Sequence, residues 1–289
     1  MAVLTINMEF AHRQASMVLD LDPTLDRTVL GFLTHRVMYE PDVAHVMLRA
    51  VQDGDVAVDV GANVGYFTVL LATLAGPHGR VVSFEPGADN LARLERNIAV
   101  SGKENITVVT QPASDVAGPT RFYLNADASG GHALWDPGRF PGNAKSAAQV
   151  RAVDVVATTL DDEVARLGLP PPKLIKIDTE GAEHRVLKGA TGLLRERRVR
   201  YIIAELHDFG LDQLGSSQQD LRGFMAQFGY ATFGLYYDGS LPKLIPPDTV
   251  LEPRQIVNLL FSTVEDVGRL WQVERFDPLV ARQAAQRTA

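Results

Sequence analysis

The stretch that decides the fold of this chain is DVAVDVGANVGYF, residues 55–67. Its first half is typical of a buried strand over Val56–Val60, and the apolar run that follows is typical of a helix over Tyr66–Ala75. The glycines between them allow a tight turn and a close approach of a ligand to the backbone, beside the unpaired N–H groups of the helix. We therefore predict a strand, a glycine-rich turn and a helix that together bind a ligand.

The carboxylate of Glu85 adds the second part of this site. It lies in the stretch SFEP, twenty residues after Gly65, at the end of a second β-rich run over Val81–Phe84. A carboxylate in that place can accept hydrogen bonds from both hydroxyls of a ribose. The two features together predict a site for a nucleoside-containing cofactor at the carboxyl ends of parallel strands.

The spacing of the glycines distinguishes between cofactors. A dinucleotide-binding turn has the pattern G-x-G-x-x-G, whereas here Gly61 and Gly65 are separated by three residues, with Asn63 between them. Asp59, at the strand end, would repel a pyrophosphate but could receive an ammonium group. A cofactor with an amino-acid end and no phosphate fits better, and S-adenosylmethionine has that shape. A nicotinamide-dependent oxidoreductase and a non-catalytic cofactor-binding scaffold stay open as alternatives.

The rest of the chain alternates strands and helices. Further buried strands are predicted over Ile106–Val109, Leu174–Ile177 and Tyr201–Ala204, and helices over Asp89–Val100 (with Asp89 as N-cap), Glu183–Glu196 and Gln218–Gln227. This alternation predicts an α/β fold with a parallel sheet and helices on both faces. Tyr230–Tyr236 and Gln255–Phe261 are expected to add an antiparallel hairpin at one edge, and residues 120–124 and 150–156 a separate antiparallel pair.

The composition excludes several classes of protein. The 289 residues are 46% hydrophobic and 22% charged, which excludes a disordered chain and a coiled coil. The absence of cysteine excludes a disulfide framework and a thiolate zinc site. A net charge of −7 disfavours nucleic acid as a partner. No targeting or membrane-spanning segment is evident, so that a cytoplasmic protein is expected.

We expect three segments along the chain. Residues 1–50 form an N-terminal cap, residues 51–265 form the cofactor-binding domain, and residues 266–289 form a C-terminal tail whose last residues, 281–289, fray. Within the domain, residues 129–148 are rich in Gly, Pro and Ala and are expected to form a lid loop.

Three motifs of this sequence resemble those of the FkbM-type S-adenosylmethionine-dependent methyltransferases. They are DVGANVGYFT at residues 59–68, GRVVSFEP at residues 79–86 and KIDTEGAE at residues 176–183. The third is the specific one, and the similarity runs from about residue 39 to about residue 261. The resemblance implies a seven-stranded Rossmann-like class I methyltransferase sheet, with five parallel strands plus an antiparallel hairpin. It also implies methylation of a hydroxyl on a sugar, natural-product intermediate or other small molecule.

The resemblance also implies roles in cofactor binding. Gly61, Asn63 and Gly65 would line the methionine and sulfonium region, and Asp59 would face the amino end. Glu85, followed by Pro86, would hold the ribose. The remaining expected cofactor contacts are Ala113, Ser114 and Asp115 near the adenine, Glu40 near the methionine end, and Asp178.

Methylation of an alcohol also needs a general base or a metal. Asp178 and Glu180 follow the strand Leu174–Ile177, and Glu205 and His207 follow the neighbouring strand. Neighbouring carboxylates push their pKa values apart, so that one of them could be a base near neutral pH. Asp178 and a partner could alternatively hold Mg²⁺. His132, in the lid loop, is a further catalytic candidate.

Structural readings of these residues stay open beside the catalytic ones. Glu180 and Glu183 would also suit the first turn of a helix, where acids interact favourably with the dipole. The sequence leaves open the identity of the hydroxylated acceptor, the dependence on metal, the general base and the formation of a homo-oligomer.

Overall fold

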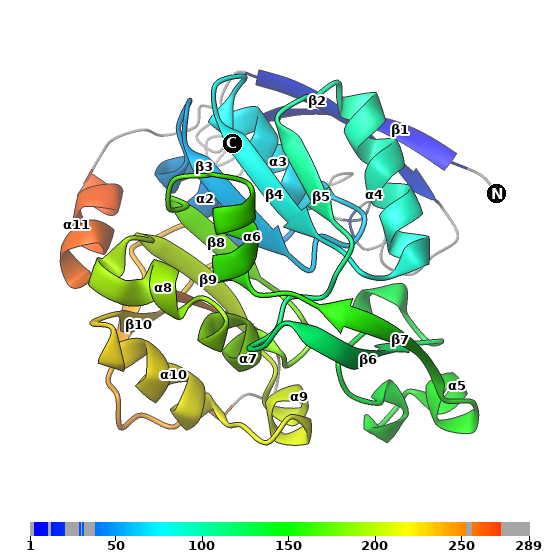
Figure 1. Ribbon diagram of the computed structural model, residues 1–289. Coiled ribbons are helices and arrows are strands. Elements are labelled where there is room, and N and C mark those ends of the chain that lie inside the picture. Colours follow the sequence, from blue (N-terminus) through cyan, green and yellow to red (C-terminus); the bar gives the residue numbers. More distant parts are fainter. Residues whose placement is uncertain are drawn as a thin grey trace, which may run out of the picture.

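A central sheet organises the computed structural model, which describes residues 3–10, 13–20, 29, 31, 38–252 and 256–272. Its strands are β3 (Val56–Val60), β4 (Arg80–Phe84), β5 (Ile106–Val109), β8 (Leu174–Ile177), β9 (Tyr201–Leu206), β10 (Ala231–Gly234), β11 (Lys243–Ile245) and β12 (Val257–Ser262). They lie in the order β11-β10-β12-β9-β8-β3-β4-β5 (Figure 1). The predicted α/β fold is confirmed.

The sheet has a parallel and an antiparallel part. β9, β8, β3, β4 and β5 are parallel, while β12 pairs antiparallel with both β9 and β10. These seven strands match the expected sheet, except that Gln255 lies outside the described residues. The sequence analysis missed β11, which pairs with β10 at the edge. β11 is short and is followed directly by two prolines, so it carries little strand signal of its own.

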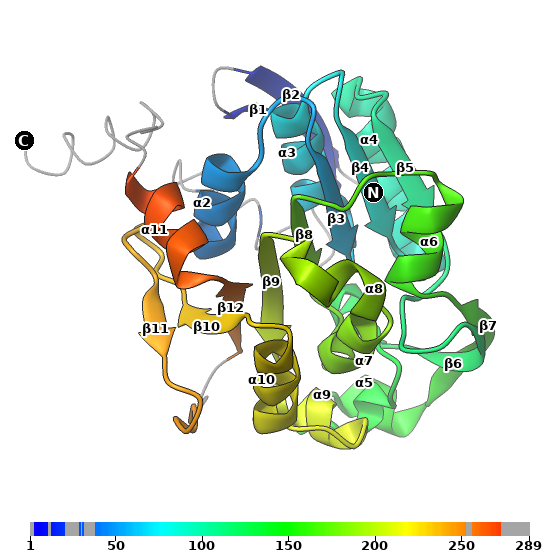
Figure 2. The same ribbon diagram turned by 60° about the vertical axis from the view of Figure 1, so that its left-hand side comes forward.

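Two layers of helices cover the sheet (Figures 1 and 2). One face carries α2 (Pro41–Ala50), α3 (Tyr66–Ala75), α4 (Ala88–Ser101) and α11 (Val264–Gln272), and the other carries α6 (Leu160–Arg166), α7 (Glu183–Lys188), α8 (Thr191–Leu194) and α10 (Gln218–Gln227). Alternate side chains of β3 enter the two cores: Ala57 joins one, and Val58 and Val60 join the other. The strands therefore need apolar residues on both sides.

The order of the strands creates a crevice beside β3. From β3 the chain passes through α3 to β4 and through α4 to β5, and it then returns to the opposite side of β3 as β8. Ligands of open α/β sheets bind at such a switch point, outside the carboxyl ends of the strands. The turn after β3 and the residues after β8 meet at this crevice.

The two described N-terminal strands pack against α3 and α4. β1 (Val3–Phe10) and β2 (Arg13–Asp20) form an antiparallel hairpin. The Val18 N–H donates a hydrogen bond of 2.7 Å to Oδ1 of Asn97 in α4, and Nδ2 of Asn97 donates one of 2.7 Å to the Val64 carbonyl. At the other end, α11 extends through residues assigned to the tail, and residues 273–289 lie outside the described part.

Two helix predictions are wrong in detail. The helix expected over Glu183–Glu196 is broken at Gly189 into α7 and α8, and Gly189 packs so closely on the Ser114 carbonyl oxygen that a Cβ there would lie 2.1 Å from it. The N-cap of α4 is Gly87 rather than Asp89, whose side chain binds His132 instead. Both residues contact distant segments, and the local pattern does not contain these contacts.

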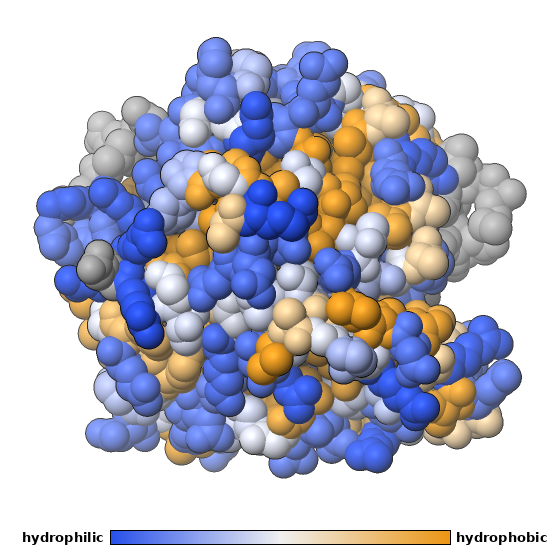
Figure 3. All heavy atoms as spheres, in the orientation of Figure 1, coloured by the Kyte–Doolittle hydropathy of each residue, from blue (hydrophilic) through white to orange (hydrophobic). Residues whose placement is uncertain are grey.

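Residues 118–157 form an arm beside the carboxyl edge of the sheet. β6 (Gly118–Leu124) and β7 (Arg151–Ala157) pair antiparallel, as predicted. Between them the expected loop contains short helices at Ser129–Gly131, Pro137–Arg139 and α5 (Ala144–Ala148). The face in Figure 3 is mostly hydrophilic, with apolar patches that include this hairpin, where Val153 and Val156 are exposed. None of the described helices is both long and apolar enough to cross a membrane.

Candidate active site

The turn after β3 is built around a glycine that only the tertiary structure explains. Gly61 has φ 81°, and a Cβ there would lie 1.8 Å from the carbonyl oxygen of Asp178. The Asp178 N–H donates a hydrogen bond of 3.0 Å to the Val60 carbonyl. The ends of β3 and β8 are therefore in direct backbone contact, which any side chain at residue 61 would separate.

Glu85 is a carboxylate that two backbone N–H groups hold at the site. Its Oε2 accepts a hydrogen bond of 2.8 Å from the Asn63 N–H, and its Oε1 accepts one of 2.8 Å from the Gly87 N–H. The residue is only 4% exposed, and burial raises the pKa of Glu85 to about 7 against the lowering effect of these two N–H groups. Each oxygen keeps one lone pair for a ligand.

Glu85 faces a pocket with about 580 Å³ of empty space, part of it open to solvent. Its floor comes from the carboxyl edge of the sheet and includes five of the predicted cofactor residues besides Glu85: Gly61, Asn63, Pro86, Ala113 and Asp178. Oδ1 of Asn63 and Oδ1 of Asn90 are buried and have no hydrogen-bond partner among the residues that the structure describes. Both residues line the pocket, so it offers unused acceptors to the donors of a ligand.

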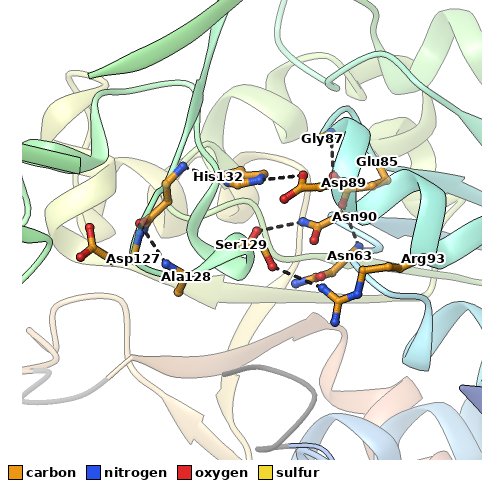
Figure 4. Close-up of polar contacts among 11 residues, drawn as sticks. Asn63, Glu85, Gly87, Asp89, Asn90, Arg93, Asp127, Ala128, Ser129 and His132 are labelled. Atoms are coloured by element: carbon orange, nitrogen blue, oxygen red, sulfur yellow. Dashed lines mark hydrogen bonds and ion pairs between the residues drawn. The ribbon is translucent and has the colours of Figure 1, made fainter. Parts of the chain in front are cut away.

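Residues 125–135 are here called the strap, and five of them line this pocket: Ser129, Gly130, His132, Ala133 and Leu134. Figure 4 shows Ser129 and His132 of the strap beside Asp89, Asn90 and Arg93. The Ser129 carbonyl accepts a hydrogen bond of 2.8 Å from Nδ2 of Asn90, and Nε2 of His132 lies 3.1 Å from Oδ1 of Asp89. The strap is also tied to β6, because Tyr123 and Ala133 exchange backbone hydrogen bonds of 2.8 and 3.1 Å. Of the lid loop expected over residues 129–148, the part that lines the pocket lies within residues 129–134, and its function as a lid stays a prediction.

A buried lysine lies behind the pocket. Nζ of Lys176, in β8, is 2.9 Å from Oδ2 of Asp178 and 3.9 Å from Oδ1 of Asp59, and it lies 4.9 Å from the ring centre of Phe67. Burial lowers the pKa of Lys176, but the carboxylates of Asp178 and Asp59 outweigh this and raise it overall. Lys176 is therefore a fixed positive charge that holds the Asp178 carboxylate in place.

The carboxylates beyond Asp178 form a cluster with raised pKa values. Burial and the charges of Asp178 and Glu183 raise the pKa of Glu180 to about 8. Burial, followed by the charge of Asp178, also raises the pKa of Glu40 to about 7 and that of Glu205 well above its ordinary value. Oε2 of Glu205 has no hydrogen-bond partner among the described residues. The cluster therefore holds protons close to neutral pH.

The two candidate histidines are held by the same kind of contact. Nδ1 of His207 accepts a hydrogen bond of 2.9 Å from the Gly210 N–H, and Nδ1 of His132 accepts one of 2.9 Å from the Asn125 N–H. Because a backbone N–H can only donate, both rings carry their proton on Nε2. In His207, Nε2 lies 3.4 Å from Oε2 of Glu180, and in His132 the Nε2–H faces Oδ1 of Asp89. In this arrangement neither ring has a free lone pair to accept a proton.

Several predicted residues lie outside the pocket wall. Asp59 is fully buried and accepts a hydrogen bond of 2.6 Å from Oγ1 of Thr68, and its role toward the amino end of a cofactor stays a prediction. Gly65 has no room for a side chain because Leu94 lies against it. Ser114 donates to Asp115, which is exposed, and neither lines the pocket beside Ala113. Glu40, Glu180, Glu205 and His207 lie in the carboxylate cluster instead.

Three residues were missed as site residues in the sequence. Asn90, in the helix predicted over Asp89–Val100, lines the pocket. Lys176 could have been noticed as a charged residue within the otherwise apolar strand LIKI. Trp135, which donates a hydrogen bond of 2.6 Å from Nε1 to the Glu180 carbonyl, has no local signal beyond its place in a loop.

The expected magnesium site is not supported. No group of three or more histidine or acidic residues in the described part of the chain has a geometry that could hold a metal ion. The charge that compensates the carboxylates is instead that of Lys176.

Comparison with known proteins identifies relatives of the chain. The family model described as "Methyltransferase FkbM domain" matches residues 59–232, more than half of the chain. Hexuronic acid methyltransferase AglP of Haloferax volcanii is 31% identical over 169 residues, which cover 58% of this chain and 62% of AglP. The 31-O-demethyl-FK506 methyltransferase FkbM of Streptomyces tacrolimicus is 31% identical over 183 residues, which cover 55% of this chain and 67% of that protein. The match to AglP thus spans less than two thirds of that relative.

Solved structures with a similar course of the chain are also methyltransferases. Precorrin-6y C5,15-methyltransferase from Geobacter metallireducens has a TM-score of 0.41 at 16% identity, over 78% of this chain and 89% of that one. The O-methyltransferase TomG from Streptomyces achromogenes, in complex with S-adenosylmethionine, has a TM-score of 0.41 at 11% identity, over 85% of this chain and 92% of that one. Similarity at this level carries no information on the substrate.

Proposed function

Since the chain belongs to the FkbM methyltransferase family, we propose that it is an S-adenosylmethionine-dependent O-methyltransferase that methylates a hydroxyl of a small acceptor, a sugar or a natural-product intermediate. The observation that carries the proposal is Glu85, whose two oxygens are aimed by backbone N–H groups and keep lone pairs toward the pocket. Two ribose hydroxyls are the donors that such a carboxylate accepts.

The pocket residues fit the cofactor in polarity and in shape. The unpartnered Asn63 and Asn90 oxygens offer acceptors, and Pro86, Ala113 and Phe84 offer apolar surface for a flat ring. When bound, S-adenosylmethionine supplies an activated methyl group on a sulfonium. The chain itself binds the adenosine part between the strand ends and the strap, and it keeps that part away from water.

Glu180 is the residue that we propose to accept the proton of the acceptor hydroxyl. Its pKa of about 8 suits a base near neutral pH, and its side chain is 23% exposed, so that an acceptor can reach it. His207 orients the carboxylate through Nε2, and Asp178, fixed by Lys176, is part of the pocket wall two residues before Glu180. Glu205 would contact the acceptor through its unpartnered oxygen. His132 would hold the strap rather than take part in proton transfer.

Calorimetry with S-adenosylhomocysteine and with NAD⁺ tests the choice of cofactor. We expect S-adenosylhomocysteine to bind with a micromolar dissociation constant and NAD⁺ not to bind. Micromolar binding of NAD⁺ without binding of S-adenosylhomocysteine would support the nicotinamide-dependent alternative and overturn the proposal.

A turnover assay tests the reaction and separates it from a scaffold role. The relatives' names suggest the acceptors: glucuronic acid as a hexuronic acid, 31-O-demethyl-FK506, and glucose as an uncharged sugar for comparison. We expect S-adenosylhomocysteine to form with at least one hydroxylated acceptor and the product to carry the methyl group on oxygen, as read by nuclear magnetic resonance. Methylation at carbon or nitrogen would contradict the proposal.

A further inference from the structure

The strap touches both halves of the site. Ser129, Gly130 and His132 line the cofactor pocket, and Trp135, three residues further, donates its indole N–H to the carbonyl of Glu180. We propose that the strap couples occupancy of the cofactor pocket to the placement of Glu180, with Trp135 as the positioning residue. The inference rests on the proposed function, because it concerns the residue that accepts the proton there.

The cofactor side of the strap is anchored on α4. Figure 4 shows Ser129 and His132 facing Asp89, Asn90 and Arg93, which all come from this helix. The hydrogen bonds are those of the Ser129 carbonyl with Asn90, of His132 with Asp89, and of Oγ of Ser129 with Nη1 of Arg93 at 3.5 Å. A Cβ at Gly130 would lie 3.4 Å from Nδ2 of Asn63. A ligand in the pocket therefore lies against the strap.

The other side of the strap is anchored on the carboxylate cluster. Trp135 is 6% exposed, and its ring centre lies 6.0 Å from that of His207 and 5.4 Å from that of Phe209. The hydrogen bond to Glu180 is thus made by a side chain that is itself fixed by packing. A movement of the strap at residues 129–134 reaches Glu180 through a rigid ring.

Glu180 needs such support because its backbone is strained. Its φ of 58° lies in the left-handed region, which is unfavourable for a residue with a side chain. The Glu180 carbonyl is confined from the other side by Gly210, where a Cβ would lie 2.2 Å from the oxygen. Trp135 and Gly210 together hold the peptide group that aims the Glu180 side chain at its place beside His207.

The first experiment compares two tryptophans that make the same kind of bond. Trp135→Phe removes the indole N–H and keeps an aromatic ring, while Trp271→Phe removes the same donor from a bond of 3.0 Å to the Gly239 carbonyl, at α11. The acceptor is the one from the panel above that gives the highest turnover. We expect Trp135→Phe to lower kcat about 10-fold, because the lost hydrogen bond to Glu180 is similar in free energy to the backbone strain that it helps to offset. The KM of the acceptor and the Kd of S-adenosylhomocysteine should change less than about 3-fold. Trp271→Phe should change none of these values.

The second experiment needs no acceptor and stays informative if Trp135→Phe does not fold. The chain has two tryptophans, so the Trp271→Phe protein emits from Trp135 alone. On titration with S-adenosylhomocysteine we expect the emission of Trp135 to change, with a midpoint equal to the calorimetric Kd. In the Trp135→Phe protein the emission of Trp271 should stay constant.

Two results would overturn the coupling while the proposed function stands. One is unchanged emission of Trp135 in a protein that binds S-adenosylhomocysteine by calorimetry. The other is an active Trp135→Phe enzyme whose kcat equals that of the unmodified protein. A failure of the proposed function is recognised separately in the unmodified protein, which would then either not bind S-adenosylhomocysteine or not methylate an oxygen of any acceptor in the panel.

Discussion

The two sides of the site differ in how their acidic groups are held. On the side of β3 and β4, Glu85 is buried but receives one backbone N–H from Gly87, in its own turn, and one from Asn63, in the turn after β3. On the side of β8 and β9, the half-buried Glu180 and Glu205 lie near Asp178, with Lys176 as the cation. The first side is organised by backbone hydrogen bonds to one carboxylate, and the second by several charges that lie close together.

This difference suggests different tasks. A carboxylate fixed by backbone donors is a rigid acceptor and suits recognition of a ligand that does not react. Carboxylates that lie close together repel one another, share protons near neutral pH and suit chemistry, whereas Glu85 is fixed by two N–H donors. The strap connects the two sides, as it contacts residues on each of them. Variants on either side should therefore separate binding from turnover.

The largest effect is expected where the two sides meet, at Gly61. Gly61→Ala would place a Cβ 1.8 Å from the Asp178 carbonyl, which forces the ends of β3 and β8 apart. We expect loss of detectable S-adenosylhomocysteine binding by calorimetry and destabilisation by about 3 kcal/mol or more in denaturant unfolding. Gly54→Ala is the matched control, because Gly54 also has a positive φ, of 87°, but open space around it. Equal effects of the two substitutions would show that backbone strain, not the contact, matters.

A smaller effect, confined to binding, is expected for Glu85→Ala. Removing the carboxylate loses two charge-assisted hydrogen bonds to the ribose, so that the Kd of S-adenosylhomocysteine should rise about 100-fold. Glu95→Ala, further along α4 and away from the pocket wall, serves as the control for general effects. An unchanged Kd in Glu85→Ala would refute the ribose role.

In Asp178→Asn we expect turnover to change while cofactor binding is kept. The substitution removes the charge that faces Lys176 at 2.9 Å and disturbs the position of the cluster. We expect kcat to fall about 100-fold while the Kd of S-adenosylhomocysteine changes less than about 5-fold. Asp154→Asn, which removes an exposed ion pair with Arg121 on the arm, should leave both values unchanged. An unchanged kcat in Asp178→Asn would contradict the assignment of turnover to the side of β8 and β9.

The smallest effect concerns the pH dependence of stability. The folded-state pKa of Glu180, about 8, lies above its ordinary value of 4.5. The proton that Glu180 holds stabilises the fold fully below pH 4.5, and this contribution is lost as pH rises through about 8. The free energy of unfolding of Glu180→Gln should therefore fall less steeply between pH 5 and 8 than that of the unmodified protein, by at most about 1.4 kcal/mol per pH unit. Glu265→Gln, an exposed residue of α11, should keep the original slope.

The sequence predicted the local parts of the site well. Short sequence patterns predict the strand, turn and helix over residues 55–75 and the acidic residue 85. Gly61, Asn63 and Glu85 all line the pocket. The sequence analysis failed for residues whose contact partner lies far away along the chain. Asp89 was predicted as a helix cap but binds His132, and the helix after Glu183 ends at Lys188, where Gly189 packs on the Ser114 carbonyl.

The sequence by itself therefore determined the α/β class, the glycine turn and the type of ligand site, because strand and helix periodicity and turn chemistry act over a few residues. Only the tertiary structure decided which polar side chains of the site pair with one another and which atoms remain available to a ligand. Lys176 pairs with Asp178, and the Nδ1 atoms of His132 and His207 accept hydrogen bonds from backbone N–H groups. Trp135 donates a hydrogen bond to the Glu180 carbonyl. The physical reason is that burial and electrostatic interactions depend on distances in space, and these join segments that lie far apart along the chain.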